Sequence, residues 1–386
     1  MRILYLTPGC FDKGGISRYS RYQIEALREN CGEKNIRTLS LFGPDRDSFE
    51  TPFKVDWYAG GISLVQKVSF AAKVIQFALA QRPDLLWTAH VSFSALVRMA
   101  AALVGAKTVA NEYGLEAWSD LGRDAAWGLK GMTEVVSDCH FTAKWMEDAG
   151  KRPKESIHVV WDCVDIERFS PRPPPLTALK KYGIPDPTTG VNILSLGRLG
   201  REAAHKGYDR LLEAFSRITK PAPTARLIFA GKGDLASELA NRAKALELEG
   251  RVFFTGMVHE DDLADVYRSA HIFSLVSDRG EGRGEGIPLT PLEAAACGVP
   301  ILVGNQDGSQ EAVVEGINGH ILDPFDLDAH ADKLLYLVHD PETRKRMGRA
   351  ARKRIEDEFA YPIFREKHRA LLAQWFPAFQ NKEEAI

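Results

Sequence analysis

Short apolar runs alternate with helical segments along this chain, and this alternation limits its possible folds more than any other feature. The first run, residues 1–7, is followed by a loop and by helical spacing over 16–28. Further strand candidates lie at 36–42, 84–89, 107–112, 134–139 and 156–161. Strands that alternate with helices predict a parallel sheet covered on both faces, with ligands at the carboxyl ends of the strands.

The alternation stops at the proline-rich segment 171–187, which we interpret as a linker, and then starts again. The second set of strand candidates is 191–197, 225–231, 251–256, 272–276, 300–304 and 319–323. A chain of 386 residues is too long for one ordinary core. We therefore predict an α/β protein with two Rossmann-like doubly wound parallel-sheet domains, 1–188 and 189–361. A C-terminal helix, about 362–386, is predicted to cross back to the first domain.

Composition excludes several classes of protein. The chain is 45% apolar and 26% charged, as globular proteins are, and its formal charge of -2 gives no field that would attract nucleic acid. The five cysteines are scattered without a Cys-x-x-Cys pair, which predicts free thiols in a reducing compartment. No apolar run is long enough for a signal-peptide core or a membrane span, so we expect a cytoplasmic protein.

The segment 278–300 leads from a strand candidate through a glycine-rich loop into a helix start near Pro291. Unpaired N–H groups at a helix N-terminus bind phosphate. Two carboxylates of the segment, Glu285 and Glu293, suit hydroxyl groups instead. Phosphate beside hydroxyls describes a nucleotide sugar, and the alternative is a surface turn with two solvated acids.

Two cations open the second half. Gly197 and Arg198 end its first strand candidate, and Lys206 precedes Gly207 at a helix start. Both cations suit a diphosphate, because Arg offers a planar fork and Lys a point charge. Two ordinary surface cations are the alternative.

Polar residues also follow the strands of the first half. The pair Gly14 and Gly15 lets backbone approach a ligand, although it lacks the full dinucleotide-binding spacing. His90 follows the strand candidate 84–89, and Tyr113 and Glu116 follow the next one. His90 is a candidate proton carrier or a polar residue without a chemical role.

A metal site is not expected from the sequence. The pair Asp45 and Asp47 follows a Gly-Pro turn, whereas a metal-dependent sugar transferase would place such a pair on a buried strand. The acids Asp326 and Asp328 are interpreted as capping charges at a helix start.

Together these motifs resemble a retaining glycosyltransferase of the GT-B architecture, in glycosyltransferase family 4 (glycosyl transferases group 1). The resemblance covers nearly the whole chain through the motifs at 14–15, 113–118, 162–165, 197–198, 206–207, 285–300, 308 and 311. It implies a metal-independent, cofactor-free transfer of a hexose from a nucleotide diphosphate sugar. The resemblance favours UDP-glucose as donor over GDP-mannose, and as acceptor a saccharide or lipid-linked saccharide in polysaccharide or glycolipid synthesis.

The resemblance also implies roles for matching residues. Arg198 and Lys206 would hold the diphosphate, Glu285 the transferred sugar and Glu293 the ribose. The other implied donor-site residues are Gly14, Gly15, Gly197, Met257, Val258, Gly286, Ile287, Pro288, Leu289 and Thr290. Met257 and Val258 would lie beside the nucleobase, and the backbone of 286–290 would cradle the phosphates. Tyr113 and His90 complete the implied catalytic set.

Four departures from the family pattern stand out. Tyr113 replaces a common histidine, and Pro288 replaces a common glycine and removes an N–H from the phosphate cradle. Seven residues separate Arg198 from Lys206 where four or five are usual, which predicts a longer loop near 201–205. The pair at 162–163, Asp-Cys, replaces a common Asn-Gly. A non-catalytic GT-B partner subunit and a GT-B sugar-nucleotide epimerase remain as alternatives.

The helix candidate 63–81 bears on where the protein acts. Lys67 and Lys73 stand among apolar residues such as Phe70 and Phe77. The segment either packs on the sheet or also forms a weak peripheral contact with the inner face of a membrane.

Overall fold

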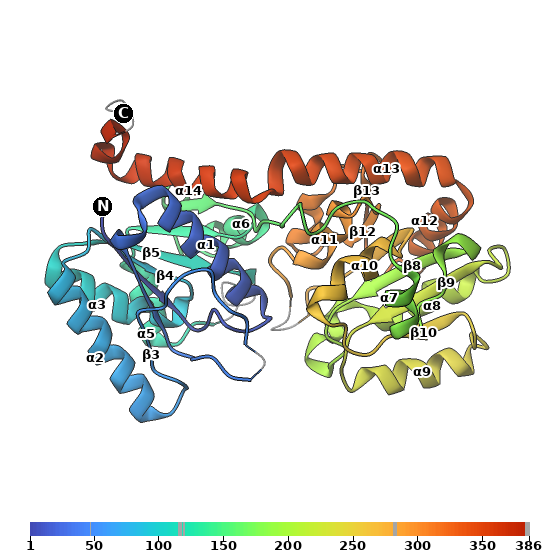
Figure 1. Cartoon of the computed structure of the whole chain (residues 1–386), viewed down its shortest axis with the longest axis horizontal. Helices are drawn as coiled ribbons and strands as arrows, with labels where there is room; N and C mark the ends of the chain where they lie inside the picture. The colour runs from blue at the N-terminus through green and yellow to red at the C-terminus, as the bar shows by residue number, and fades with distance from the viewer. Residues whose placement is uncertain (47, 115–117, 119, 281–283, 383–386) are drawn as a thin grey trace. The chain divides into compact units, whose positions relative to one another are not determined.

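The computed structural model describes the chain except for residues 47, 115–117, 119, 281–283 and 383–386. The chain divides into two compact units (Figure 1). Unit 1 comprises Met1–Cys163 and Tyr361–Ile386, and unit 2 comprises Val164–Ala360.

In the described part of unit 1, seven strands form a parallel sheet in the order β3-β2-β1-β4-β5-β6-β7. The strands are β1 (Ile3–Thr7), β2 (Ile36–Ser40), β3 (Trp57–Tyr58), β4 (Leu85–Thr88), β5 (Lys107–Glu112), β6 (Glu134–Ser137) and β7 (Ile157–Val159). The helices are α1 (Gly15–Cys31), α2 (Leu64–Gln81), α3 (Ser94–Val104), α5 (Arg123–Lys130), α6 (His140–Asp148) and α14 (Tyr361–Trp375). Short 3₁₀ helices are η1 (Glu33–Asn35), η2 (Val91–Phe93), η3 (Lys154–Ser156) and η9 (Pro377–Lys382).

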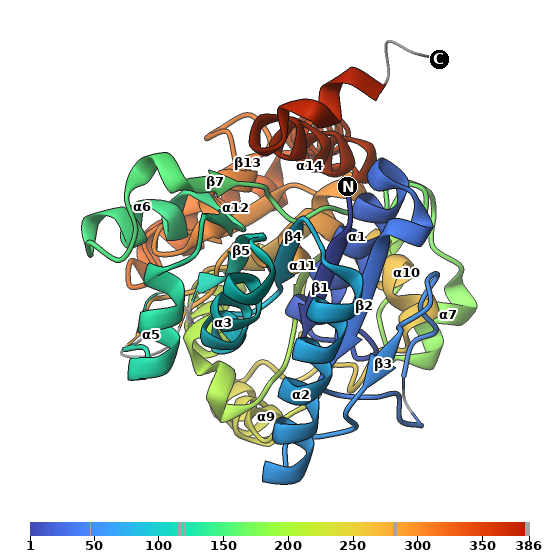
Figure 2. The same ribbon diagram turned by 90° about the vertical axis from the view of Figure 1, so that its left-hand side faces the viewer.

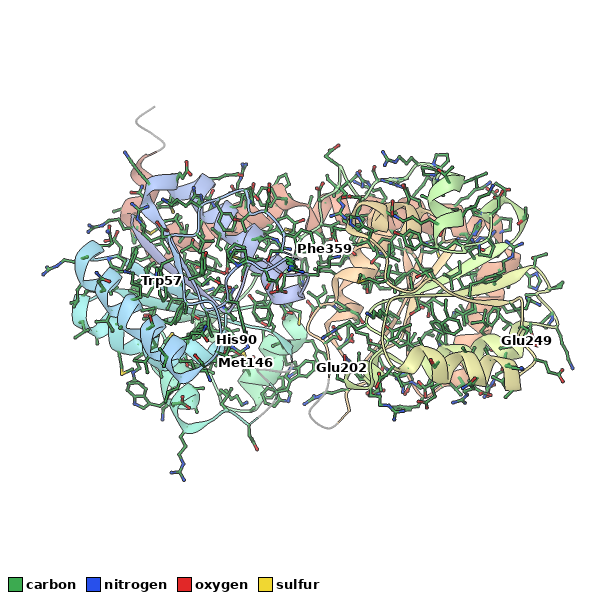
Figure 3. The ribbon with its side chains drawn as sticks, turned by 60° about the horizontal axis from the view of Figure 1, so that its bottom comes forward. Trp57, His90, Met146, Glu202, Glu249 and Phe359 are labelled. Carbon is green, nitrogen blue, oxygen red and sulfur yellow. The ribbon has the colours of Figure 1, made fainter. Side chains whose placement is uncertain are left out.

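Helices cover both faces of this sheet because successive strand residues point to opposite sides. Tyr5 belongs to one apolar cluster with Leu27 of α1 and Trp375 of α14. Its neighbour Leu6 belongs to a second cluster with Phe70 of α2 and residues of α3 and α5. Figure 2 shows α2 and α3 beside the strands, and Figure 3 shows the side chains that fill the unit.

In the described part of unit 2, six strands form a parallel sheet in the order β10-β9-β8-β11-β12-β13. The strands are β8 (Val191–Leu196), β9 (Ala225–Ala230), β10 (Val252–Phe254), β11 (Ile272–Leu275), β12 (Ile301–Gly304) and β13 (Gly319–Leu322). The helices are α7 (Leu176–Lys181), α8 (Tyr208–Ile218), α9 (Leu235–Ala245), α10 (Leu263–Arg268), α11 (Leu289–Ala296), α12 (Leu327–His339) and α13 (Pro341–Arg354). The short helical turns are η4 (Pro187–Thr189), η5 (Arg201–Lys206), η6 (Glu260–Asp262), η7 (Gly308–Ala312) and the π-helical η8 (Ile355–Phe359).

Most strands lie within one or two residues of their predicted positions, and the predicted class of two parallel α/β sheets is confirmed. Helix starts also follow their capping residues. Ser63 begins α2 with a capping box that involves Gln66, and the Asp326 side chain accepts from the Ala329 N–H at the start of α12. The capping interpretation of Asp326 is therefore confirmed.

The segment that separates the two sheets differs from its predicted description as a linker. Unit 2 begins at Val164, whereas the predicted domain began at 189, because Val164 pairs with Ala360 inside unit 2. Arg352 also binds the carbonyl oxygens of Ile166 and Phe169. The proline-rich stretch contains α7, whose neighbour Tyr182 donates its hydroxyl to Asp262 at 2.6 Å.

Two further predictions concern the state of the cysteines and the ability of the helices to span a membrane. All five cysteines are free thiols, and four of them, Cys10, Cys139, Cys163 and Cys297, are buried. Within the described ranges, no helix combines the length and the apolar character needed to cross a bilayer.

Candidate functional site

The candidate site of unit 2 lies where β8 and β11 are neighbours. These strands pair in parallel although they are separated in sequence by β9 and β10, so the chain leaves them toward opposite edges of the sheet. Such a switch point opens a crevice at the carboxyl ends of the strands. Arg198 follows β8 and Glu285 follows β11, so the sheet topology brings their loops to the same edge.

One carboxylate is held by two donors at this edge. The Lys206 Nζ lies 2.7 Å from Glu285 Oε1, and the His205 Nε2 lies 2.8 Å from the same oxygen. The other oxygen, Oε2, makes no hydrogen bond or ion pair with a residue that the structure describes, and the Glu285 side chain is 23% exposed. Glu285 thus offers one oxygen to a ligand while its neighbours fix the other.

Electrostatics keep Glu285 ionised. Burial by itself raises the pKa of this carboxyl, but the charge of Lys206 and the hydrogen bonds from His205 and Lys206 outweigh it and lower the pKa to about 2. A permanently ionised carboxylate accepts hydrogen bonds and donates none. Glu285 therefore suits a ligand that presents hydroxyl groups.

The predicted longer loop is the 3₁₀ helix η5, which carries both donors. It ends at Gly207, whose φ of +73° is a left-handed conformation that a side chain disfavours. A Cβ at this position would also lie 2.6 Å from the Val276 carbonyl oxygen. Gly207 thus lets the chain turn tightly beside β11 and into α8.

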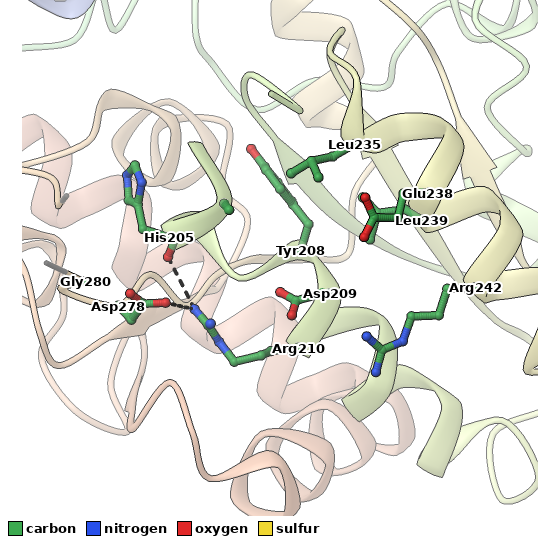
Figure 4. Close-up of a pocket in the computed structure, with 11 residues that line it drawn as sticks. His205, Tyr208, Asp209, Arg210, Leu235, Glu238, Leu239, Arg242, Asp278 and Gly280 are labelled. Atoms are coloured by element: carbon green, nitrogen blue, oxygen red, sulfur yellow. Dashed lines mark hydrogen bonds and ion pairs between the residues drawn. The ribbon is translucent and has the colours of Figure 1, made fainter. Parts of the chain in front are cut away.

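Two residues that form an ion pair with each other both donate hydrogen bonds to the backbone carbonyl of His205. The Asp278 N–H donates to the His205 carbonyl oxygen at 2.8 Å, and Arg210 donates to it at 3.3 Å. Arg210 also pairs with the Asp278 carboxylate at 2.5 Å. Figure 4 shows Arg210 between these two partners, at the edge of a pocket of about 480 Å³ beneath η5. His205 lines this pocket, but Arg198, Lys206, Glu285 and Glu293 do not, so it is separate from the edge where they gather.

Arg198 is exposed and makes no hydrogen bond or ion pair with any described residue. Its charge acts on the buried Tyr208, as that of Glu285 does, which places it near the same group of residues. An exposed arginine without an internal partner is available to an anion.

The second predicted acid, Glu293, is drawn inward. It lies on α11, is 2% exposed and accepts a hydrogen bond from the Tyr267 hydroxyl at 2.7 Å. The family resemblance implies that Glu293 binds ribose, but here its carboxylate is buried and bonded to Tyr267 instead. The start of α11 carries no side-chain cap, and the N–H groups of Leu289 and Thr290 in its first turn have no acceptor within the helix. Pro288 stands at the N-cap and contributes no N–H.

Several buried polar atoms around these loops have no hydrogen-bond partner among the described residues. They are His205 Nδ1, Tyr208 Oη, Arg210 Nε, Ser277 Oγ, Thr290 Oγ1 and Asp307 Oδ2. Buried polar atoms in folded proteins are nearly always satisfied, so a cluster of unsatisfied ones marks a place where water or a ligand completes the structure. This cluster coincides with the predicted donor loops.

Asp307 was missed by the sequence analysis. It begins η7 and is fully buried, and its Oδ1 accepts from the N–H and hydroxyl of Ser309. Burial first, and also the charge of Glu285, raises its pKa to about 7 against the hydrogen bonds from Ser309. The Gly308 N–H donates to the Gly286 carbonyl at 2.8 Å, which ties η7 to the donor loop. Aspartate is so common a cap before a helical turn that its position in the sequence does not indicate this location.

In unit 1, the paired glycines follow the loop after β1. Gly14 and Gly15 are exposed at the start of α1, and a Cβ at Gly15 would meet no atom within 4 Å. The Gly14 N–H already donates to Asp12 Oδ1 at 2.6 Å. An anion at this helix start would therefore have to displace the Asp12 carboxylate.

Tyr113 and His90 follow β5 and β4, as predicted. The Tyr113 hydroxyl accepts from the Asn111 amide at 2.8 Å, and burial raises its pKa well above the ordinary value. Tyr113 therefore keeps its proton and can donate but not act as a base. The His90 Nδ1 accepts from the Ser92 N–H at the start of η2, and Figure 3 labels this histidine.

The remaining predicted positions lie around these groups. Gly197 ends β8, and a Cβ there would lie 2.5 Å from the Tyr208 hydroxyl. Met257 is 67% exposed just after β10, and Val258 follows it. Glu116 lies outside the described residues. No group of three or more His, Cys, Asp or Glu within the described ranges has the arrangement of a metal site.

Comparison with known proteins decides the family. The profile of the family "Glycosyl transferases group 1" matches residues 183–354. Corynebacterium glutamicum has a GDP-mannose-dependent monoacylated alpha-(1-6)-phosphatidylinositol monomannoside mannosyltransferase that is 30% identical over 294 residues, which are 74% of either chain. This chain belongs to the group 1 glycosyltransferases.

Other similarities agree with this family. The mannosylfructose-phosphate synthase of Agrobacterium fabrum is 35% identical over 191 residues, 47% of this chain and 39% of that protein. Among solved structures, HepE of Anabaena in complex with UDP has a TM-score of 0.78 at 18% identity, with 97% of this chain and 100% of that chain covered. This group 1 glycosyltransferase therefore has the GT-B fold and transfers a glycosyl group from a nucleotide sugar.

Proposed function

We propose that this glycosyltransferase moves a hexose from a nucleotide diphosphate sugar to a saccharide or lipid-linked saccharide, with retention of anomeric configuration and without a metal ion. The contact of Lys206 with Glu285 carries the proposal, together with the exposed Arg198, which pairs with none of the residues that the structure describes. This group places two cations for a diphosphate next to one acceptor for sugar hydroxyls. GDP-mannose is the donor to test first, because the Corynebacterium relative is named for its dependence on it. UDP-glucose, which the family resemblance favoured, is the second.

The contact between Lys206 and Glu285 suggests how the donor is bound. Lys206 pairs with Glu285, and a diphosphate would share the ammonium group with the carboxylate. Arg198 and Lys206 would then stabilise the charge that develops on the leaving nucleotide. The Glu285 Oε2 would accept a hydrogen bond from a hydroxyl group of the transferred sugar, and the first turn of α11 would bind phosphate.

Retention without a metal requires attack from the face that the nucleotide leaves. The bond from the anomeric carbon to the phosphate oxygen breaks, the bond to the acceptor oxygen forms, and the departing phosphate takes the acceptor proton. In unit 1, Tyr113 would donate a hydrogen bond to a bound sugar, and Gly14 and Gly15 would give backbone access to the diphosphate. His90 is the candidate for a further polar contact with the sugar.

Assays with GDP-mannose and UDP-glucose test this proposal. We expect one donor to be hydrolysed slowly alone and transferred faster with a saccharide acceptor, at a rate that EDTA leaves unchanged. NMR of the product should show the donor's anomeric configuration. Lys206→Ala or Arg198→Ala should lower kcat/KM by about 100-fold, whereas Lys220→Ala, at an exposed position of unit 2, should not.

Three results would contradict the proposal. Absence of donor binding, transfer and hydrolysis would exclude the activity. Isomerised donor without an acceptor would indicate an epimerase. Unchanged glycan production in cells that carry Lys206→Ala, with loss of production on deletion, would indicate a non-catalytic partner subunit.

A weak membrane contact is the second part of the proposal, and helix α2 carries it. One side of α2 packs on unit 1 through Phe70, Val74 and Ala78. The other side exposes Leu64, Val65 and Val68 by 77%, 78% and 61%. The helix contains Lys67 and Lys73 but no acidic residue. Exposed apolar side chains beside lysines suit the surface of an anionic bilayer.

Cosedimentation with vesicles of anionic phospholipid tests this contact. The wild type should sediment at low salt, and a Leu64→Ser/Val65→Ser/Val68→Ser variant should remain in solution. Leu103→Ser, at a leucine of α3 that is 58% exposed, should sediment like the wild type. A wild-type protein that stays in solution at low salt would exclude the contact.

A further inference from the structure

The loop between Arg198 and Lys206 is longer than is usual in the family, and its residues fold into a short helix. They form η5, whose start is tied to α9 because the Arg201 N–H donates to Asp234 at 2.9 Å. Its end is tied to the loop after β11 through the His205 carbonyl, which accepts from Asp278 and Arg210. The backbone of His205 is therefore held by the loop after β11 and by α8.

This anchoring aims the imidazole ring at Glu285. The His205 side chain is 9% exposed, and its Nε2 lies 2.8 Å from Glu285 Oε1. That oxygen is the one that Lys206 also contacts. The ring's other nitrogen, Nδ1, is buried without a hydrogen-bond partner among the described residues. The only hydrogen bond of the ring in the described chain is therefore the one to Glu285.

The two hydrogen-bond donors to Glu285, Lys206 and His205, would behave differently once a nucleotide sugar is bound. A diphosphate would draw the Lys206 ammonium toward itself, because two phosphates carry more charge than one carboxylate. Lys206 would then hold Glu285 less firmly at the moment when its orientation matters. His205 has no such competing partner, so it remains to fix Oε1 and leave Oε2 directed to the sugar.

We infer that His205 is a positioning residue that orients Glu285 toward the hydroxyl groups of the transferred sugar. This inference rests on the proposed function of the site. The longer loop would then serve to place a second hydrogen-bond donor to Glu285, the His205 ring, beside Lys206. His205 would act through Glu285 and would not touch the reacting atoms.

The experiment compares sugar recognition with nucleotide binding in the full-length protein. His205→Ala should lower kcat/KM for the nucleotide sugar by about tenfold, the value of one hydrogen bond to a charged group. Its affinity for the nucleoside diphosphate alone should stay at the wild-type value. His205→Gln should recover most of the activity, because its amide can donate to the same oxygen. His320→Gln, which changes another His–Glu pair of unit 2, should leave both quantities unchanged.

A double-mutant cycle tests whether the effect passes through Glu285. His205→Ala should cause no further loss in a Glu285→Ala background, because residues that act as a unit are not additive. Full additivity would overturn the inference, as would unchanged activity of His205→Ala. A parallel loss of nucleoside diphosphate affinity would also overturn it, since His205 would then only support Lys206. Failure of the wild type to bind any nucleotide sugar would instead contradict the proposed function.

Discussion

At the scale of single residues, the candidate site is defined by carboxylates whose surroundings push their pKa values in opposite directions. Lys206 and His205 lower the pKa of Glu285 to about 2, whereas burial raises that of Asp307 to about 7. Glu285 is thus ionised at neutral pH. Asp307 is the described carboxyl of this site whose charge changes near neutral pH.

The pH dependence of stability should show the burial of Asp307. Below its ordinary pKa of 3.8 this group is protonated in both states, and between 3.8 and about 7 it ionises only in the unfolded chain. Stability is therefore lost as pH rises to about 7. Asp307→Asn, which cannot ionise but still caps η7, should be more stable than the wild type at pH 8 by roughly 1–3 kcal/mol. Urea unfolding should show this gain shrink toward pH 4.

A second aspartate serves as the control for this prediction. Asp326 also accepts a backbone N–H at a helix start but is exposed. Asp326→Asn should change stability little, and by the same amount at both pH values. An equal effect of the two substitutions would show that burial of Asp307 does not disturb its ionisation.

At the scale of elements, the start of α11 balances stability against phosphate binding. Pro288 has a φ of -70°, which suits proline, but offers no N–H to a phosphate. Pro288→Gly should bind the nucleoside diphosphate a few-fold more tightly, because it adds one donor. It should also lower the free energy of unfolding by about 1 kcal/mol, because glycine has more freedom in the unfolded chain.

Calorimetric titration and urea unfolding measure these two effects. Pro341 begins α13 away from the site, so Pro341→Gly is a matched control that should lower stability without changing nucleotide affinity. Weaker binding by Pro288→Gly would show that the rigid turn matters more than the missing N–H.

Helix α14 should contribute strongly to the stability of unit 1. The last residue of α14, Trp375, is 4% exposed, and the centroid of the Trp375 ring lies 5.5 Å from that of Trp87 in β4. Trp375→Ala should lower the free energy of unfolding by about 3–5 kcal/mol. Trp127→Ala removes an indole that is 48% exposed and should cost far less, by the same denaturation measurement. Equal costs would show that α14 is only loosely packed.

At the scale of the whole molecule, the chain builds unit 1, then unit 2, and returns to unit 1 at Tyr361. The residues proposed to hold the diphosphate most directly, Arg198 and Lys206, belong to unit 2. A nucleoside diphosphate should therefore slow amide hydrogen exchange in unit 2 around 197–207 and 285–293, because a ligand of the folded state suppresses local opening. Protection confined to unit 1 would contradict this placement of the site.

Much of this arrangement could be predicted from local sequence. The apolar runs located almost every strand, since a strand buried on both faces requires consecutive apolar residues. The two-residue strand β3 was missed because Trp57 and Tyr58 carry no such run. The helix α7 was missed because the prolines before it suggested irregular chain, although proline is tolerated ahead of a helix.

The sequence by itself determined the two parallel sheets, the family and the candidate residues of the donor loop. Only the tertiary structure decided which of these residues meet. His205 and Glu285 are 80 positions apart, and they touch because β8 and β11 are neighbours and present their following loops at one edge. Strand order and side-chain direction depend on packing of the whole sheet, so no local pattern of residues contains them. Packing of the folded unit also buries Asp307 and brings Glu293 to its internal partner, Tyr267.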